Sequence, residues 1–210
     1  MITVGTWNLE NLFRPGSGAA PGSDAAYDAK TDGAEVITEL APDVLAVQEV
    51  GEPEALADLM DRLDGAWHTE LAAPDGRGIR VGVPARLVLD GAEQVVTFPD
   101  KLDPVQVDDD GTTMSAMGRP ALRVRIKTED TTLDVISCHL KSKLLSFPDG
   151  FSPRDEDQRA RYAVYALHRR AAEAAAIRAY ATALLANNGQ QGSSKAPPSR
   201  AGPKPSARWP

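Results

Sequence analysis

The chain has 210 residues, of which 42% are hydrophobic and 25% are charged, and its formal net charge is -7. This composition is typical of a folded globular protein and excludes a chain that is disordered throughout. The acidic balance also excludes a general attraction to nucleic acid, so a bound phosphate requires a local site or a metal ion. A single cysteine rules out an internal disulfide. We therefore expect a cytoplasmic protein, with no signal peptide and no membrane span.

The first third of the chain predicts the order strand, helix, strand, helix. β-branched residues alternate over residues 2–7, which is typical of a strand, and a helix is expected within residues 30–40. Residues 43–50 form an almost continuous apolar run, as in a strand covered on both faces. A second helix is expected over residues 53–63, with a proline at its first position.

The middle of the chain predicts several hairpin strands. They are expected at residues 67–71, 79–89, 93–98, 121–127 and 132–140. The turn Asp75-Gly76-Arg77-Gly78 joins the first two. In the strand over residues 121–127, apolar residues alternate with basic ones, which predicts one solvent-exposed face. Helices and strands in this order predict an α/β domain with mixed sheets.

The C-terminal part consists of a long helix followed by a segment of different composition. Residues 155–186 are rich in alanine and arginine, which favour a helix, and Asn187-Asn188-Gly189 is a suitable stop. Residues 189–210 contain five prolines, four basic residues and no acidic residue. Such a segment cannot bury enough apolar surface to fold. We therefore expect one folded unit over residues 1–188 and a disordered Pro-rich tail over residues 189–210.

Four polar residues stand at or beside the predicted strands: Asn8, Glu49, Arg119 and His139. Carboxylate and amide oxygens are the hard ligands that Mg²⁺ prefers. Arginine clamps phosphate oxygens, and histidine donates a hydrogen bond or transfers a proton. Together these residue types are compatible with a phosphate site that holds a metal ion.

Each of the four also has a purely structural interpretation. Asn8 suits a turn after a strand, and Glu49 suits a solvated strand end. Arg119 suits an exposed base like its neighbours along the strand, and His139 suits a satisfied structural histidine. The residue types alone leave these alternatives open.

The order of the motifs favours the chemical interpretation. Four segments carry them: Thr6-Trp7-Asn8-Leu9-Glu10-Asn11-Leu12, Pro42-Asp43-Val44-Leu45-Ala46-Val47-Gln48-Glu49-Val50, Gly118-Arg119-Pro120 and Ser137-Cys138-His139-Leu140-Lys141-Ser142. Over residues 1 to about 186 the chain closely resembles the endonuclease/exonuclease/phosphatase superfamily, which includes deoxyribonuclease I, exonuclease III and inositol-polyphosphate 5-phosphatases. The Trp-Asn and Gln-Glu pairs at the ends of the first two strands are the most specific part of this resemblance.

The resemblance implies a deoxyribonuclease I-like two-sheet α/β sandwich that hydrolyses phosphodiesters. It implies that Asn8 and Glu49 hold a catalytic Mg²⁺, with Mn²⁺ as the alternative ion. Arg119 would contact the substrate phosphate, and His139 would stabilise the pentacovalent phosphate or assist the leaving group. The implied substrate is a phosphodiester such as DNA or another nucleic acid. Lipid and inositol phosphates share the same metal corner and stay open as alternatives.

The chain departs from the family pattern after the long helix. The family continues with a strand ending in Asp-x-Asn and, later, an Asp-His pair, and neither motif occurs in this sequence. We therefore expect an incomplete fold whose C-terminal half is missing, with the inner face of its sheet largely uncovered. The corresponding functional expectation is the N-terminal part of a longer enzyme, with little or no activity as given.

A non-enzymatic protein is the competing interpretation. It would be a degenerate fragment, or a half-domain that binds a protein partner through the exposed sheet face and the basic tail. The basic residues of the tail are Lys195, Arg200, Lys204 and Arg208. Composition alone favours a solvated end for this tail over a binding segment, and the sequence does not identify the partner.

Overall fold

A computed structural model describes residues 1–17, 24–142, 144–147 and 155–193 of the protein. Its N-terminal elements are β1 (Val4–Leu12), α1 (Asp24–Thr31), α2 (Ala34–Leu40), β2 (Val44–Val50), α3 (Pro53–Met60), β3 (His68–Leu71) and β4 (Arg80–Ala85). They are followed by β5 (Leu89–Thr97), β6 (Val105–Gln106), β7 (Thr113–Met114), β8 (Ala116–Lys127), β9 (Thr132–Ser137) and α4 (Glu156–Ser193).

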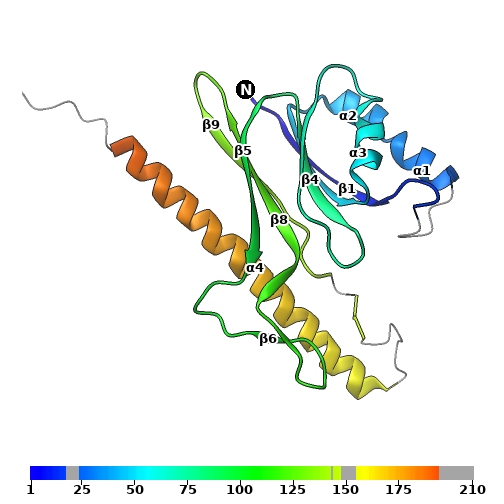
Figure 1. The fold of residues 1–210 in the computed structure, drawn as a ribbon, viewed down its shortest axis with the longest axis vertical. Coiled ribbons are helices and arrows are strands. Elements are labelled where there is room, and N and C mark those ends of the chain that lie inside the picture. Colours follow the sequence, from blue (N-terminus) through cyan, green and yellow to red (C-terminus); the bar gives the residue numbers. More distant parts are fainter. Residues whose placement is uncertain (18–23, 143, 148–154, 194–210) are drawn as a thin grey trace, which may run out of the picture.

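The elements form four layers (Figure 1). The first sheet has the order β1-β2-β4-β3, in which β1 and β2 are parallel and the other pairs are antiparallel. The second sheet, β5-β8-β9, is antiparallel, and β6 pairs with β7 as a separate small ribbon. Helices α1, α2 and α3 cover the outer face of the first sheet, and α4 lies against the second sheet. The predicted two-sheet α/β architecture is thus confirmed.

Strand β2 lies at the centre of this packing. Leu45 and Val47 belong to the apolar cluster shared with the outer helices, whereas Val44 and Ala46 belong to the cluster between the two sheets. Successive residues of a strand point to opposite faces, so a strand covered on both sides needs a continuous apolar run. The prediction of a doubly covered strand over residues 43–50 is confirmed.

The expectation of an uncovered inner face is wrong for most of the first sheet. Val81 and Val83 of β4 pack against Leu122 and Val124 of β8, and all four are almost fully buried. The reason is that the chain itself supplies the second sheet. The inner face is open along β1, where Val4 is 49% exposed.

Two other predictions along the strands are corrected. The strand expected over residues 79–89 ends at Ala85, and the chain then crosses to the second sheet and resumes as β5. The face of β8 expected to be solvent-exposed is covered at Arg123, because α4 packs on this sheet, and becomes exposed toward the end of the strand at Lys127. Arg123 is only 5% exposed, and its charge is paired with Asp134 of β9 at 2.5 Å.

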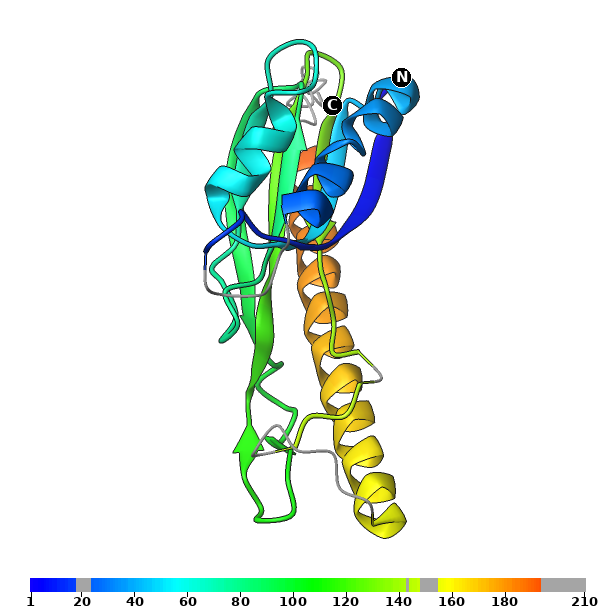
Figure 2. The same ribbon diagram turned by 90° about the vertical axis from the view of Figure 1, so that its right-hand side faces the viewer.

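Helix α4 is longer than predicted and extends beyond both sheets toward β6 (Figure 2). It continues through Gly189 to Ser193, so the stop predicted at Asn187-Asn188-Gly189 is wrong. The rest of the predicted tail, residues 194–210, lies outside the described residues. Among the helices that are described, none combines the length and apolar character needed to cross a bilayer.

Candidate active site

Two irregular strand segments lie side by side in the first sheet. β1 pairs regularly with β2 as far as Asn8, which lies opposite Gln48, and pairing resumes only at Leu12, opposite Val50. Three residues of β1 therefore face one residue of β2, Glu49, which is also an extra residue in the pairing of β2 with β4. Bulges of this kind re-aim side chains and often adjoin functional sites.

The bulges hold residues other than glycine in the left-handed backbone region. The φ angles are 52° for Glu10, 61° for Asn11 and 60° for Glu49. Such conformations cost about 1–3 kcal/mol each and persist only where the surrounding structure fixes them. Close packing is part of that surrounding structure, since a Cβ on Gly51 would lie 2.5 Å from the Phe13 ring.

The bulges bring Asn8 and Glu49 into direct contact, and His139 joins them from the second sheet. The Asn8 Nδ2 group donates to Glu49 Oε1 at 3.2 Å, while Asn8 Oδ1 accepts from the Glu10 amide at 2.9 Å. His139 Nε2 lies 3.6 Å from the same Glu49 oxygen. One carboxylate oxygen thus lies between an amide and an imidazole from three different segments.

A buried hydrogen bond fixes the segment that carries His139. The Ser137 hydroxyl, at the last residue of β9, donates to the Val47 carbonyl of β2 at 3.0 Å. Ser137 is 1% exposed. The bond joins the two sheets two residues before His139, so the imidazole position follows from the packing of β9 on β2.

Arg119 forms a buried ion pair with Asp75, a residue of the turn between β3 and β4. Arg119 Nη2 lies 2.7 Å from Asp75 Oδ2, and the side chains are 8% and 11% exposed. The other Asp75 oxygen accepts from the backbone amides of Arg77 and Ile79 at 2.9 and 3.0 Å. Burial raises the pKa of Asp75, but the Ile79 amide and the Arg119 guanidinium outweigh it and lower the pKa below its ordinary value. The turn therefore presents a charged carboxylate to Arg119.

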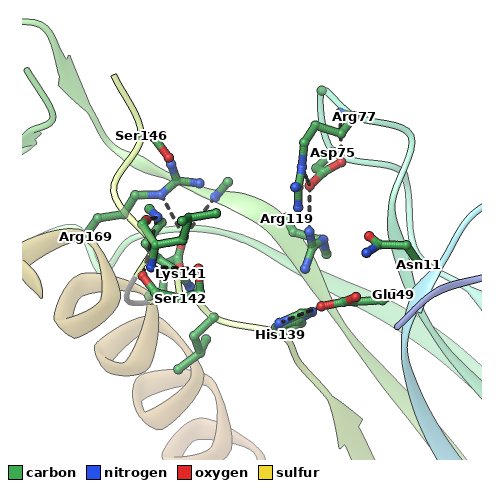
Figure 3. A pocket seen from close by; sticks show the side chains of 15 residues that line it. Asn11, Glu49, Asp75, Arg77, Arg119, His139, Lys141, Ser142, Ser146 and Arg169 are labelled. Atoms are coloured by element: carbon green, nitrogen blue, oxygen red, sulfur yellow. Dashed lines mark hydrogen bonds and ion pairs between the residues drawn. The ribbon is translucent and has the colours of Figure 1, made fainter. Parts of the chain in front are cut away.

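These groups surround a cavity of about 480 Å³ (Figure 3). Its lining includes Glu49, Asp75, Arg77, Arg119, His139, Lys141, Arg169 and Glu173. Figure 3 shows Arg119, Asp75, His139 and Glu49 on one side and Lys141 and Arg169 on the other. Four cationic side chains thus face three carboxylates in a protein of net charge -7. The cavity is locally suited to an anion.

The setting of His139 favours the neutral imidazole. Burial lowers its pKa below the ordinary value, the charge of Arg119 lowers it further, and Glu49 opposes both effects. His139 Nδ1 and Arg119 Nε are buried and have no hydrogen-bond partner among the described residues. A buried polar atom left unpaired costs about 1–3 kcal/mol, so a ligand that pairs with it gains binding energy.

The structure brings together all four residues singled out from the sequence. Glu49, Arg119 and His139 line one cavity, and Asn8 contacts Glu49 at its edge. Sequence reasoning missed two further residues, Asp75 and Glu173. The Asp-Gly turn was visible only as a hairpin signal, and Glu173 had no visible signal within its helix.

The donor groups suit a hard divalent cation held largely by water and substrate. Glu49 supplies one carboxylate, and Asn8 Oδ1 keeps a second lone pair beside its bond to the Glu10 amide. Mg²⁺ commonly uses only one or two carboxylates and completes its shell with water and phosphate oxygens. Within the described ranges, no three His, Cys, Asp or Glu side chains gather in a metal cluster. The residues present therefore fit Mg²⁺ rather than a closed metal cage.

Comparison with known proteins gives matches only among solved structures. No protein-family model matches the sequence, and no curated protein matches it. One similar structure is an endonuclease/exonuclease/phosphatase family protein from Leptotrichia buccalis, with 18% identity and a TM-score of 0.46 over 67% of this chain. Another is TDP2 from Caenorhabditis elegans, with 15% identity and a TM-score of 0.41 over 64% of this chain.

The matched region covers only part of each of those two proteins. The alignments cover 55% of the Leptotrichia protein and 34% of the Caenorhabditis protein, so the chain matches about half and about a third of their lengths. The first of the two is described as a member of the family that the sequence motifs resemble.

Proposed function

We propose that the protein binds a phosphodiester in the cavity beside Glu49 and belongs functionally to the Mg²⁺-dependent phosphodiester hydrolases of endonuclease type. The observation that carries this proposal is the convergence of Asn8, Glu49, Arg119 and His139 from four separate segments on one cavity. A chance set of turn, surface and core residues has no reason to meet at one point.

Each side chain has a role that matches its setting. The buried Arg119 guanidinium, oriented by Asp75, binds phosphate oxygens, and its unpaired Nε offers a further donor. The neutral imidazole of His139 donates a hydrogen bond to the phosphate without adding charge. Glu49 and Asn8 would hold Mg²⁺, which would supply Lewis-acid chemistry beside the phosphate.

We further propose that hydrolysis by these residues alone is slow. The attack of water on a phosphodiester needs a base that is free to take a proton. Around this cavity, Asp75 is paired with Arg119, and His139 lies against Glu49. The sequence also lacks the Asp-x-Asn and Asp-His motifs that the resembled family uses. The proposed state is therefore a protein that binds phosphodiesters with little or no turnover.

The experiment measures binding and hydrolysis separately. Calorimetric titration with dimethyl phosphate in the presence of Mg²⁺ should show binding, and Glu49→Gln should weaken Mg²⁺ binding by about 10- to 100-fold. Glu54→Gln is the matched control, because Glu54 is an exposed carboxylate on α3. Hydrolysis of a fluorescent DNA strand should stay near background. Absence of phosphate binding would refute the site, and Mg²⁺-dependent cleavage abolished by Glu49→Ala would refute the slow turnover.

A second function is favoured by the open strip along β1 and β9. Within the part of the chain that is described, each of these strands has a neighbour on one side only. Between them lies a groove of about 280 Å³, lined by Val4, Gly5, Thr6, Ala46, Gln48, Val135, Ile136, Ser137 and Cys138. Unpaired strand edges beside apolar side chains suit an extended peptide that adds as a further strand.

This alternative is a non-enzymatic half-domain that binds a protein partner. Thermal unfolding of the purified chain tests whether the open strip is a stable binding surface or an unprotected edge that aggregates. A cooperative transition at low concentration would show a module that is stable with the strip exposed, as a binding role requires. Aggregation that depends on concentration and is relieved by Val4→Lys would instead indicate an unprotected edge and would contradict the binding role.

A further inference from the structure

Helix α4 carries a buried carboxylate beside the candidate active site. Glu173 is only 2% exposed, although glutamate is among the residues least often buried. Its Oε1 accepts from the Gly118 amide at 3.2 Å and from Arg169 Nε at 3.1 Å. Its Oε2 accepts from the Lys141 amide at 2.5 Å. Three donors thus satisfy a charge that would otherwise be costly to bury.

The two backbone amides belong to the segments that carry the phosphate-facing residues. Gly118 immediately precedes Arg119, and Lys141 follows His139 by two residues. A single side chain from α4 therefore ties together two backbone segments that line the cavity. The neighbouring Arg170 adds to this link, because its Nη1 donates to the Lys141 carbonyl at 2.8 Å.

The β-sheet does not fix the backbone at Gly118. Pairing of β8 with β5 is irregular between Ala116 and Ala121, and its pairing with β9 reaches only as far as Leu122. Gly118 and Arg119 lie in this gap in the ladder. The Glu173 carboxylate takes the place of a neighbouring strand by accepting the Gly118 amide.

The Arg169 side chain of α4 packs against the same point. A Cβ on Gly118 would overlap the Arg169 guanidinium, so the absence of a side chain lets α4 lie directly on this backbone. Arg169 also neutralises Glu173 through an ion pair one helical turn away. The apolar contact of the helix with the second sheet includes Ala172 and Ala176, with Ile177 and Tyr180 packed beside them. The buried carboxylate adds directional hydrogen bonds to this apolar contact.

We propose that Glu173 is a positioning residue that sets the distance and orientation between Arg119 and His139. The proposal rests on the function proposed above, since it assigns Glu173 to the phosphate-binding cavity. In this role, Glu173 makes phosphate binding in the cavity depend on the docking of α4. A small displacement of binding groups has a large effect, so we expect loss of this clamp to weaken phosphate binding by about 10-fold or more.

Two substitutions separate positioning from charge. Glu173→Gln keeps the side-chain length but removes a negative charge from the cavity wall and leaves one of the two backbone amides facing an NH₂ group. Glu173→Asp keeps the charge but shortens the side chain. Electrostatics alone predicts tighter phosphate binding for the first variant and unchanged binding for the second. Positioning predicts weaker binding for both.

Tyr180→Phe is the matched control. Tyr180 lies two turns further along α4, and its hydroxyl bonds to Glu93 of β5, away from the cavity. This variant loosens the same helix without touching the site. All variants are compared with the unaltered protein at a temperature well below their unfolding midpoints, so that every sample is folded.

Two readouts keep this proposal distinct from the proposed function. The first is the NMR resonances of the His139 imidazole and the Arg119 side chain in the free protein. The second is titration with inorganic phosphate. The expected result is a shift of both side chains and weaker phosphate binding in both Glu173 variants, with neither change in Tyr180→Phe.

The resonances decide the positioning role even if the unaltered protein binds no phosphate, an outcome that would refute the proposed function alone. Resonances in both Glu173 variants that coincide with those of the unaltered protein would overturn the positioning role. Phosphate binding that is unchanged or tighter in both variants would overturn it as well.

Discussion

The two helical layers pack on their sheets in different ways. The outer layer buries large apolar side chains such as Ile37, Leu56 and Leu59, each 1% exposed or less. At its interface with the second sheet, α4 instead contributes the small residues Ala172 and Ala176 together with the charged Glu173, and Arg123 of β8 is buried as well. Apolar burial stabilises a fold without fixing direction, whereas hydrogen-bonded charges fix relative positions. We therefore expect the outer helical layer to supply most of the free energy of folding. The interface between α4 and the second sheet is expected to fix the geometry of the candidate site.

If the outer layer supplies most of the stability, Leu56→Ala should give the largest effect. Leu56 is fully buried between α3 and the first sheet. Its truncation should lower the free energy of unfolding by about 2–5 kcal/mol, measured by urea denaturation. Leu40→Ala is the control, because Leu40 is 65% exposed and its loss should change stability by less than about 0.5 kcal/mol. Equal losses in the two variants would contradict the comparison.

The buried charges at the interface between α4 and the second sheet should contribute less to the free energy of unfolding, and their contribution should depend on pH. The Arg125 side chain holds the pKa of Asp134 below its ordinary value, and Arg123 assists against the opposing effect of burial. At pH 7, Asp134→Asn should lower the free energy of unfolding by about 1.5–3 kcal/mol. The folded state keeps Asp134 ionised to a lower pH than the unfolded chain does. The stabilisation is therefore complete above about pH 4 and lost as the pH falls through the folded-state pKa.

Urea denaturation of the unaltered protein and Asp134→Asn between pH 2 and pH 7 measures this contribution. The gap between the two curves should close at the acidic end. A gap that stays constant over the whole range would mean that the loss comes from packing and not from the carboxylate charge.

The smallest effect concerns the strained backbone at the site. Glu49 has a φ of 60°, which glycine adopts freely and alanine does not. Glu49→Gly should therefore be about 1 kcal/mol more stable than Glu49→Ala, although both lose the same carboxylate. Thermal unfolding of the two variants side by side measures the difference. Equal stabilities would show that the bulge relaxes once the carboxylate is gone.

Local pattern was enough to predict the part of the site that lies on neighbouring strands. Asn8 and Glu49 follow apolar stretches joined by helical sequence, and parallel strands connected in this way place their ends at one edge of a sheet. The continuous apolar run of β2 likewise predicts its place between two layers. The placement of these strand ends needed only neighbours in the chain and the periods of helices and strands, whereas the roles expected of Asn8 and Glu49 came from the family resemblance.

The remaining parts depend on partners that lie far away in the chain. Asp75 meets Arg119 across 44 positions, and Glu173 meets Gly118 across 55. The periodic patterns of helices and strands in the sequence do not indicate pairs of residues that lie so far apart in the chain. Arg123 shows the same limit, because its alternation with apolar residues is that of a solvated face, and only the arrival of α4 and Asp134 makes it a buried one.

The extra residue at position 49 also bears on how such a site is gained or lost in evolution. Gln48 lies opposite Val81, and Val50 lies opposite Arg80, so the ladder between β2 and β4 would be regular without residue 49. Deletion of a single codon there would remove the carboxylate and a strained residue in one step, while the apolar faces on both sides keep their register. The smallest change that removes the carboxylate thus also gives a more regular and less strained sheet. A lineage that keeps residue 49 retains it against that tendency.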